Sequence, residues 1–192
     1  MTSTLRFLAQ AACCLLLATT TASLAQSGGK NNADDTSPPP AAASSQWLEY
    51  RPAGRGFRIE LPGVPTEQDA TVQTGIGPVI NHVAAVGGES WAFTLQYADF
   101  PSAMSSQPTS TTLRNTRNGE LREATLRSEM DLTVSGLPAK RLAFVKNDNS
   151  FVVHSLIVVK GLRVYQAIHT VRPGMEKPAD IDHFIRSFAI LN

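Results

Sequence analysis

Cysteine is nearly absent from this sequence. Among 192 residues the two cysteines are Cys13 and Cys14, and both lie close to the N-terminus. If residues 1–25 are removed, the remaining chain has no thiolate nucleophile, no cysteine metal ligand and no disulfide. Its stability then has to come from packing, even in an oxidising compartment that permits disulfides.

The N-terminus also lacks a hydrophobic run long enough to span a membrane. The apolar run over residues 7–18 has about 12 residues, whereas a spanning helix needs about 20. It follows Arg6 and precedes small residues at Ser23 and Ala25, the pattern that signal peptidase recognises. We therefore predict that residues 1–25 are a cleaved signal peptide and that the protein is exported, periplasmic or secreted. Retention as an anchor is the alternative; a lipid anchor at either cysteine would leave too short a hydrophobic signal.

The chain carries almost no net charge. It has 17 basic and 16 acidic residues, and loss of Arg6 with the signal peptide leaves 16 of each. Such a balance provides no long-range field that would attract nucleic acid or an anionic membrane. We therefore expect no nucleic-acid partner and, after signal cleavage, no stable membrane span.

Bulky apolar side chains are scarce over residues 26–46, which are rich in Pro, Ala, Ser, Gly and Asn. Such a segment buries too little apolar surface to offset the entropy of ordering it, so we predict a disordered linker. The remainder, residues 47–192, is about 146 residues long, the usual size of one domain with one core. It has no internal repeat, and we expect a single α+β domain.

The first half of this domain has the alternating pattern of β-strands. Phe57, Ile59 and Leu61 alternate with polar residues and would share one face of a strand. Turns are expected at 75–78 and at Gly87-Gly88. The further strands expected here cover residues 67–74, 79–86 and 90–99.

The last of these strands has a bulky face and a small one. Trp91, Phe93, Leu95 and Tyr97 form an aromatic stripe on one face, while small and polar residues occupy the other. We expect the stripe to belong to the core and another element to pack closely against the small face.

Short polar turns separate apolar runs in the second half, which predicts an antiparallel meander. The strands expected here cover residues 120–134, 139–145, 151–159 and 162–171. The run 151–159 is apolar on both faces, so this strand should be central and covered on both sides. Such cover requires helices on each face, or one helix and a partner.

Two helices are predicted. Residues 109–118 suit a short helix, with Ser110 as its cap and Asn118-Gly119 as its stop signal. At the C-terminal end, residues 178–188 place apolar side chains at positions i, i+3, i+4 and i+7, the spacing of one helical face. These side chains are Ile181, Phe184, Ile185 and Phe188. A short strand at 189–191 would close the chain.

No pattern for catalysis, cofactor binding or metal binding emerges. There is no Gly-x-Ser-x-Gly elbow, the Gly75-Ile76-Gly77 segment lacks the third glycine of a dinucleotide loop, and no two histidines have helical zinc-site spacing. His154 and His169 fall on neighbouring strands but not directly opposite each other if the turn is at Lys160-Gly161. We therefore expect no catalytic, cofactor-binding or metal-ligating residues, and no cofactor.

Two groups of charged residues are assigned to solvent. Arg51, Arg55 and Arg58 form a mildly basic corner, for which an anion site is the alternative. Four carboxylates alternate with Arg122 and Arg127, which is typical of a solvated face rather than of general acid and base chemistry. They are Glu120, Glu123, Glu129 and Asp131.

Several short motifs resemble those of a widespread group of bacterial envelope proteins of unknown function. They cover Trp47–Tyr50 with Gly56–Pro65, Gly77–Val79, Tyr97–Pro101, Gly136–Leu142 and Phe184–Phe188. That group is similar to the Mog1/PsbP-like fold, an antiparallel sheet of about six to eight strands flanked by helices on both faces. The resemblance implies this fold, and by analogy a role in binding protein partners.

The leading hypothesis is a non-enzymatic binding or accessory module of the cell envelope whose protein partner is unidentified. The alternative is a carrier that holds an apolar small molecule on the sheet face. A pocket lined by Trp91, Phe93 or Tyr165 would favour the carrier. An enzyme is the third hypothesis, and it requires Glu, Asp or His side chains that converge in one cleft.

Overall fold

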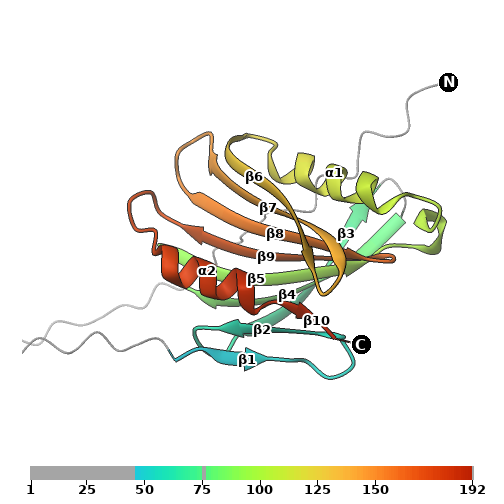
Figure 1. Ribbon diagram of the computed structural model, residues 1–192, viewed down its shortest axis with the longest axis horizontal. Helices are drawn as coiled ribbons and strands as arrows, with labels where there is room; N and C mark the ends of the chain where they lie inside the picture. The colour runs from blue at the N-terminus through green and yellow to red at the C-terminus, as the bar shows by residue number, and fades with distance from the viewer. Residues whose placement is uncertain (1–45, 75–76, 192) are drawn as a thin grey trace, which may run out of the picture.

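A computed structural model describes residues 46–74 and 77–191 (Figure 1). The predicted signal peptide, nearly all of the predicted linker and the Gly75-Ile76 turn lie outside these ranges. The described residues form a seven-stranded sheet, a three-stranded sheet and two α-helices, and every strand pair is antiparallel. The model is therefore a mostly antiparallel sheet structure.

The larger sheet contains the predicted hairpins. Its strands in spatial order are β3 (Thr66–Thr74), β4 (Gly77–Gly87), β5 (Trp91–Asp99), β9 (Arg163–Val171), β8 (Val152–Lys160), β7 (Leu137–Lys146) and β6 (Ala124–Val134). The turn between β4 and β5 is closed by the Gly88 N–H, which donates to the Trp91 carbonyl at 2.8 Å. The expected meander of the second half is confirmed by the consecutive pairs β6–β7, β7–β8 and β8–β9.

A smaller sheet lies beside the first (Figure 1). It consists of β1 (Leu48–Tyr50), β2 (Phe57–Leu61) and β10 (Ala189–Ile190), with β2 in the middle. The strand at Phe57–Leu61 and the short closing strand were predicted. Strand β1 was not predicted, because three residues are too few to show an alternating pattern.

The helices are α1 (Thr109–Glu120) and α2 (Pro178–Ser187), and a 3₁₀ turn, η1 (Ser102–Met104), precedes α1. The predicted start of α1 at residue 109 is confirmed, whereas its predicted cap and its predicted end were wrong. Pro108 occupies the N-cap position and no side chain caps the helix, so Ser110 is not the cap. The helix also continues through Gly119 to Glu120, so the next strand begins at Ala124 and not at Glu120.

Strand β8 has the central, buried position that its apolar sequence predicts. It lies between β9 and β7, and seven of its nine residues are buried. Leu156 and Val158 belong to one core cluster, whereas Val153 and Ile157 belong to another. Because side chains alternate along a strand, the two clusters lie on opposite faces of the sheet.

The two clusters are covered by different elements. The first contains apolar side chains of α2 and of the smaller sheet, such as Phe184 and Phe57, and the second contains Leu113 of α1. The expectation of helices on both faces holds only in part. Helix α1 contacts β7 and β8, and the smaller sheet shares the cover of the other face with α2.

The register between β8 and β9 differs from the predicted one. The turn is at Gly161-Leu162, so Lys160 pairs with Arg163 and His154 lies directly opposite His169. Gly161 has φ of 58°, a left-handed conformation that costs glycine little, and this favours it in a two-residue turn. A shift of the turn by one residue therefore brought the two histidines together.

Candidate functional site

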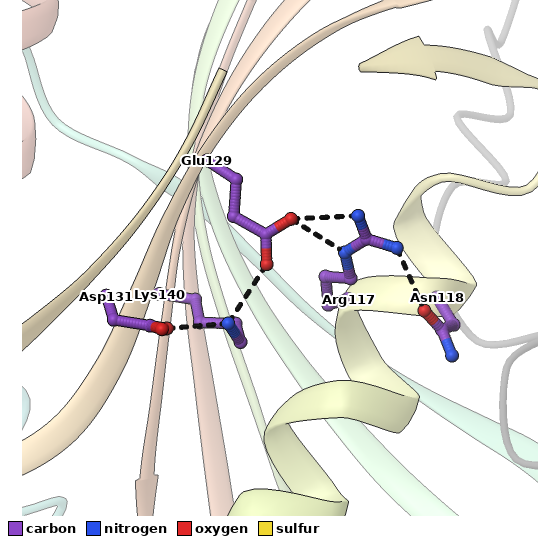
Figure 2. Close-up of polar contacts among 5 residues, drawn as sticks. All are labelled: Arg117, Asn118, Glu129, Asp131 and Lys140. Atoms are coloured by element: carbon purple, nitrogen blue, oxygen red, sulfur yellow. Dashed lines mark hydrogen bonds and ion pairs between the residues drawn. The ribbon is translucent and has the colours of Figure 1, made fainter. Parts of the chain in front are cut away.

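A charged cleft of about 510 Å³ lies between α1 and the edge of the larger sheet formed by β6 and β7. Its lining residues are Ser110, Leu113, Arg114, Arg117, Asn118, Glu129, Asp131 and Lys140. We refer to it below as the charged cleft. Figure 2 shows the ion-pair network that runs along it.

Glu129 stands at the centre of this network. Its Oε2 accepts hydrogen bonds from Arg117 Nε at 3.0 Å and Nη2 at 2.8 Å, and its Oε1 accepts one from Lys140 Nζ at 2.9 Å (Figure 2). Lys140 also donates to Asp131 at 2.6 Å, and Arg117 donates to Asn118 at 3.1 Å. The network therefore links α1 to both β6 and β7.

Secondary structure explains how these side chains meet. Glu129 and Asp131 are two residues apart in β6, so they point to the same face. Lys140 of β7 is the register partner of Asp131. On α1, Arg114 and Asn118 are four residues apart and share a face of the helix.

The charged forms of Glu129 and Lys140 are favoured by their partners in this network. The Arg117 guanidinium and then the Lys140 ammonium hold the pKa of the Glu129 carboxyl below its usual range. Hydrogen bonds to Asp131 and Glu129 raise the pKa of Lys140. The carboxylates of the cleft are therefore neutralised by cations of this same chain.

We expect Glu129→Gln to destabilise the protein by about 1 kcal/mol at neutral pH, because it leaves two cations facing each other at a partly exposed site. A lowered carboxyl pKa stabilises the fold above the pKa of the unfolded chain, and this contribution is lost as pH falls through the folded pKa. Urea denaturation at pH 7 and at pH 3 measures it, with exposed Glu89→Gln as the control. A difference that is equal at both pH values contradicts the role of the charge.

Arg114 differs from the other two cations of the charged cleft in its ion pairing. It is exposed, it lines the charged cleft, and no carboxylate of the described residues lies within ion-pair distance of it. Three cationic and two acidic side chains line the cleft, which leaves one positive charge in excess. Sequence analysis assigned Glu129 and Asp131 to a solvated face beside Arg122 and Arg127, whereas their partners are Arg117 and Lys140.

Glu120 was also assigned to the solvated face, and this was wrong. Its side chain is buried, with 4 % of the residue exposed, at the C-terminal end of α1. Oε1 accepts hydrogen bonds from Ser155 Oγ at 2.8 Å and from Gln166 Nε2, while Oε2 is buried with no hydrogen-bond partner among the described residues. Burial raises the pKa of this carboxyl to about 7, against the lowering effect of the two hydrogen bonds and of Lys146.

A chain of amides extends from Glu120 across the sheet. Gln96 Nε2 donates to Gln166 Oε1 at 2.9 Å, and Asn81 Nδ2 donates to Gln96 Oε1 at 3.3 Å. The chain therefore crosses β9, β5 and β4 on the α1 side of the sheet. One sequence signal for it exists, because Leu113 and Glu120 are seven residues apart and share the buried face of α1.

His154 and His169 are register partners, with ring centroids 6.2 Å apart. Burial lowers the pKa of both rings, that of His169 to about 4, so both are neutral near pH 7. Over residues 46–74 and 77–191, no group of three or more His, Cys, Asp or Glu side chains is arranged to hold a metal ion.

Two arginines of the predicted basic corner, Arg55 and Arg58, contact different partners. Arg58 pairs with Glu49 at 3.2 Å, and Arg55 lies over the ring of Tyr97 at 5.7 Å. Each of these two arginines is thus engaged by another side chain of the fold.

The aromatic stripe is part of the core, as predicted, except at its first residue. Phe93 and Tyr97 are buried, whereas Trp91 is 38 % exposed. The Phe93 ring packs against Phe184 at 5.0 Å between centroids, and Tyr165 packs against Phe57 at 5.6 Å. These rings pack against one another in the core, and none of them lines the charged cleft.

No family model and no curated protein matches this chain. Among solved structures, it is similar to the solution structure of cyanobacterial PsbP (CyanoP) from Synechocystis sp. PCC 6803, with a TM-score of 0.50 and 11 % identity. That match covers 78 % of this chain and 95 % of CyanoP. A looser match is the crystal structure of PA94 from Pseudomonas aeruginosa, described as a protein of unknown function and putative regulator, with a TM-score of 0.37 and 14 % identity. This match covers 71 % of this chain and 87 % of PA94.

The first match shows a PsbP-like fold, which agrees with the expected fold. The second is too loose to carry an argument. None of the helices in the described residues has the length and apolar character that a membrane span requires.

Proposed function

We propose that this chain is a non-enzymatic binding or accessory module of the bacterial cell envelope, and that a protein partner docks at the charged cleft. The N-terminal pattern of residues 1–25 supports export. The PsbP-like fold supplies a scaffold but does not identify a partner. The proposal therefore depends on the cleft itself.

The observation that carries the proposal is that Arg114 has no ion-pair partner among the described residues. The other cations of the cleft are tied to Glu129 and Asp131, whereas the Arg114 guanidinium is exposed and has no counter-ion among the described residues. A guanidinium binds a carboxylate with two parallel hydrogen bonds, which makes arginine a preferred residue for such recognition. The partner is therefore a protein segment with an acidic side chain.

The surroundings of Arg114 favour this kind of partner. Glu129 and Asp131 are each paired with a cation of this chain, and this weakens their repulsion of an incoming carboxylate. Ser110 lies one helical turn before Arg114 on the same face and adds a hydroxyl to the cleft. Because the network joins α1 to β6 and β7, the cleft is held in shape before binding, which reduces the entropy cost of docking.

The experiment has two steps. A photo-reactive amino acid at position 110 of the full chain, an exposed position that lines the cleft and leaves Arg114 in place, captures the partner in cells, and position 122 serves as the control. The purified partner is then titrated with the Arg114→Glu and Arg122→Glu variants, which make the same charge change at two exposed positions of the α1 region. We expect Arg114→Glu to weaken binding at least about tenfold and Arg122→Glu to leave it nearly unchanged.

Two results would contradict the proposal. One is an identical set of cross-linked products from positions 110 and 122, which would indicate random contact. The other is equal weakening by both charge reversals, which would indicate general electrostatic attraction and not docking in the cleft.

A further inference from the structure

A second cleft, of about 210 Å³, lies where the first turns of α1 face the turn between β8 and β9. We propose that this neutral cleft binds a single uncharged, hydroxyl-rich ring, that is, one neutral sugar residue. No lysine, arginine, histidine, aspartate or glutamate lines it. This inference is independent of the charged cleft, which lies on other residues of α1.

The polar side of the neutral cleft consists of hydroxyls and amides. Ser105, Thr112 and Thr116 supply hydroxyls, and Gln107 and Asn115 supply amides. Gln107 Nε2 donates to Thr112 Oγ1 at 3.0 Å, which orients both side chains. The Thr112 hydroxyl hydrogen and the Gln107 carbonyl oxygen stay available, so the pair can both donate to and accept from a ligand hydroxyl.

The opposite side of the neutral cleft is apolar. Phe100, Met104 and Leu162 contribute to its lining. The Phe100 N–H donates to the Leu162 carbonyl at 2.9 Å, which fixes the loop before α1 against the β8–β9 turn. An apolar wall facing a few oriented polar groups is the usual composition of a small-molecule site, and the C–H face of a sugar ring can pack on such a wall.

Size and charge narrow the ligand class. A volume of about 210 Å³ has room for about seven water molecules, which suits one six-membered ring with its hydroxyls and not a chain of rings. No side-chain cation lines the cleft to balance the charge of a carboxylate or phosphate.

The test is a nuclear magnetic resonance titration of the isotope-labelled full chain. The probes are glucose and N-acetylglucosamine, with glucuronate as the charged comparator. We expect the neutral sugars to shift amide signals of residues 100–116 and 161–162 with a dissociation constant of about 1 mM, the affinity of a small polar ligand. Glucuronate should bind at least about tenfold more weakly.

Thr112→Val and Thr111→Val are matched variants, because the two threonines are adjacent in α1 and only Thr112 lines the neutral cleft. We expect Thr112→Val to weaken sugar binding at least about tenfold and Thr111→Val to leave it unchanged. Asn115→Asp, which adds a charge at nearly constant shape, should abolish it. Thermal unfolding of each variant separates loss of binding from loss of folding.

The methyl glycosides of the two sugars distinguish a free sugar from the end of a glycan chain. Glycosides that bind as tightly as the free sugars indicate a chain end, and glycosides that fail while the free sugars bind indicate a free sugar; both results support the site. The inference is overturned if no signal of residues 100–116 or 161–162 shifts at sugar concentrations well above the expected constant. Equal binding of glucuronate, or equal loss in the two threonine variants, overturns it as well.

Discussion

Replacing Glu120 by glutamine is expected to shift the stability difference between the variant and the wild-type protein by about 3 kcal/mol in favour of the variant from pH 4 to pH 9. The carboxyl has a pKa of about 7 in the folded chain, because burial disfavours its charged form, against a usual value of 4.5. Glutamine is neutral at every pH and keeps the carbonyl oxygen that accepts from Ser155 and Gln166. The variant therefore avoids the cost of a buried charge and keeps these two hydrogen bonds. Its NH2 group takes the place of Oε2, which has no hydrogen-bond partner among the described residues, and this adds a cost that does not depend on pH.

The stabilisation should depend on pH in a defined direction. Below about pH 4 the carboxyl is protonated in both the folded and the unfolded chain, so the stability difference between the two proteins does not change with pH there. Between the usual pKa and about 7 the unfolded carboxyl ionises while the folded one stays protonated, and the wild-type protein loses stability as pH rises. Above about pH 7 the wild-type protein loses no further stability from this group, because the carboxyl is then ionised in both the folded and the unfolded chain.

Urea denaturation of both proteins from pH 4 to pH 9 measures this difference. The exposed Glu89→Gln variant is the control, and we expect it to follow the wild-type protein at each pH. A constant difference between Glu120→Gln and the wild-type protein across this range would show that Glu120 does not titrate with a raised pKa.

Phe57→Ala is expected to destabilise the protein by about 4 kcal/mol, because the cavity it leaves adds to the lost apolar burial. Phe57 is fully buried, with its ring centroid 5.4 Å from Tyr97, 5.6 Å from Tyr165 and 6.2 Å from Phe188. It belongs to β2 of the smaller sheet, whereas Tyr97 and Tyr165 belong to β5 and β9 of the larger sheet. The ring therefore joins the two sheets.

Chemical denaturation and amide hydrogen exchange test this role. We expect the global stability to fall and the amides of β1, β2 and β10 to exchange fastest in the variant, since these strands lose their largest contact with the core. Val64→Ala is the control, because Val64 is 83 % exposed and should change stability by less than about 0.5 kcal/mol. A loss below about 1 kcal/mol in Phe57→Ala would mean that the smaller sheet contributes little to the fold.

Both helices and every strand of the described residues except β1 could be predicted, because their signals are local. Phe57, Ile59 and Leu61 alternate within five residues, and all three are fully buried. Strand β8 is apolar along most of its length and is buried on both faces. Such patterns depend on the periods of the strand and the helix, which neighbouring residues of one segment determine.

Element limits and register were less certain, because they depend on single residues at turns. The Lys160-Gly161-Leu162 segment permits two positions for a two-residue turn, and they place different residues opposite His154. Glycine at 119 is a stop signal in isolation, yet α1 continues for one residue beyond it. That residue is Glu120, whose hydrogen bonds with Ser155 and Gln166 belong to the tertiary structure.

By itself, the sequence determined the antiparallel strand pattern, the central position of β8 and the apolar face of α2. Only the tertiary structure decided that Glu120 is buried, that Glu129 pairs with Arg117 and Lys140, and that two clefts of different charge lie beside α1. The physical reason is distance along the chain. Apolar alternation acts within one element, whereas the pKa and pairing of a charged group depend on residues that folding brings from other elements.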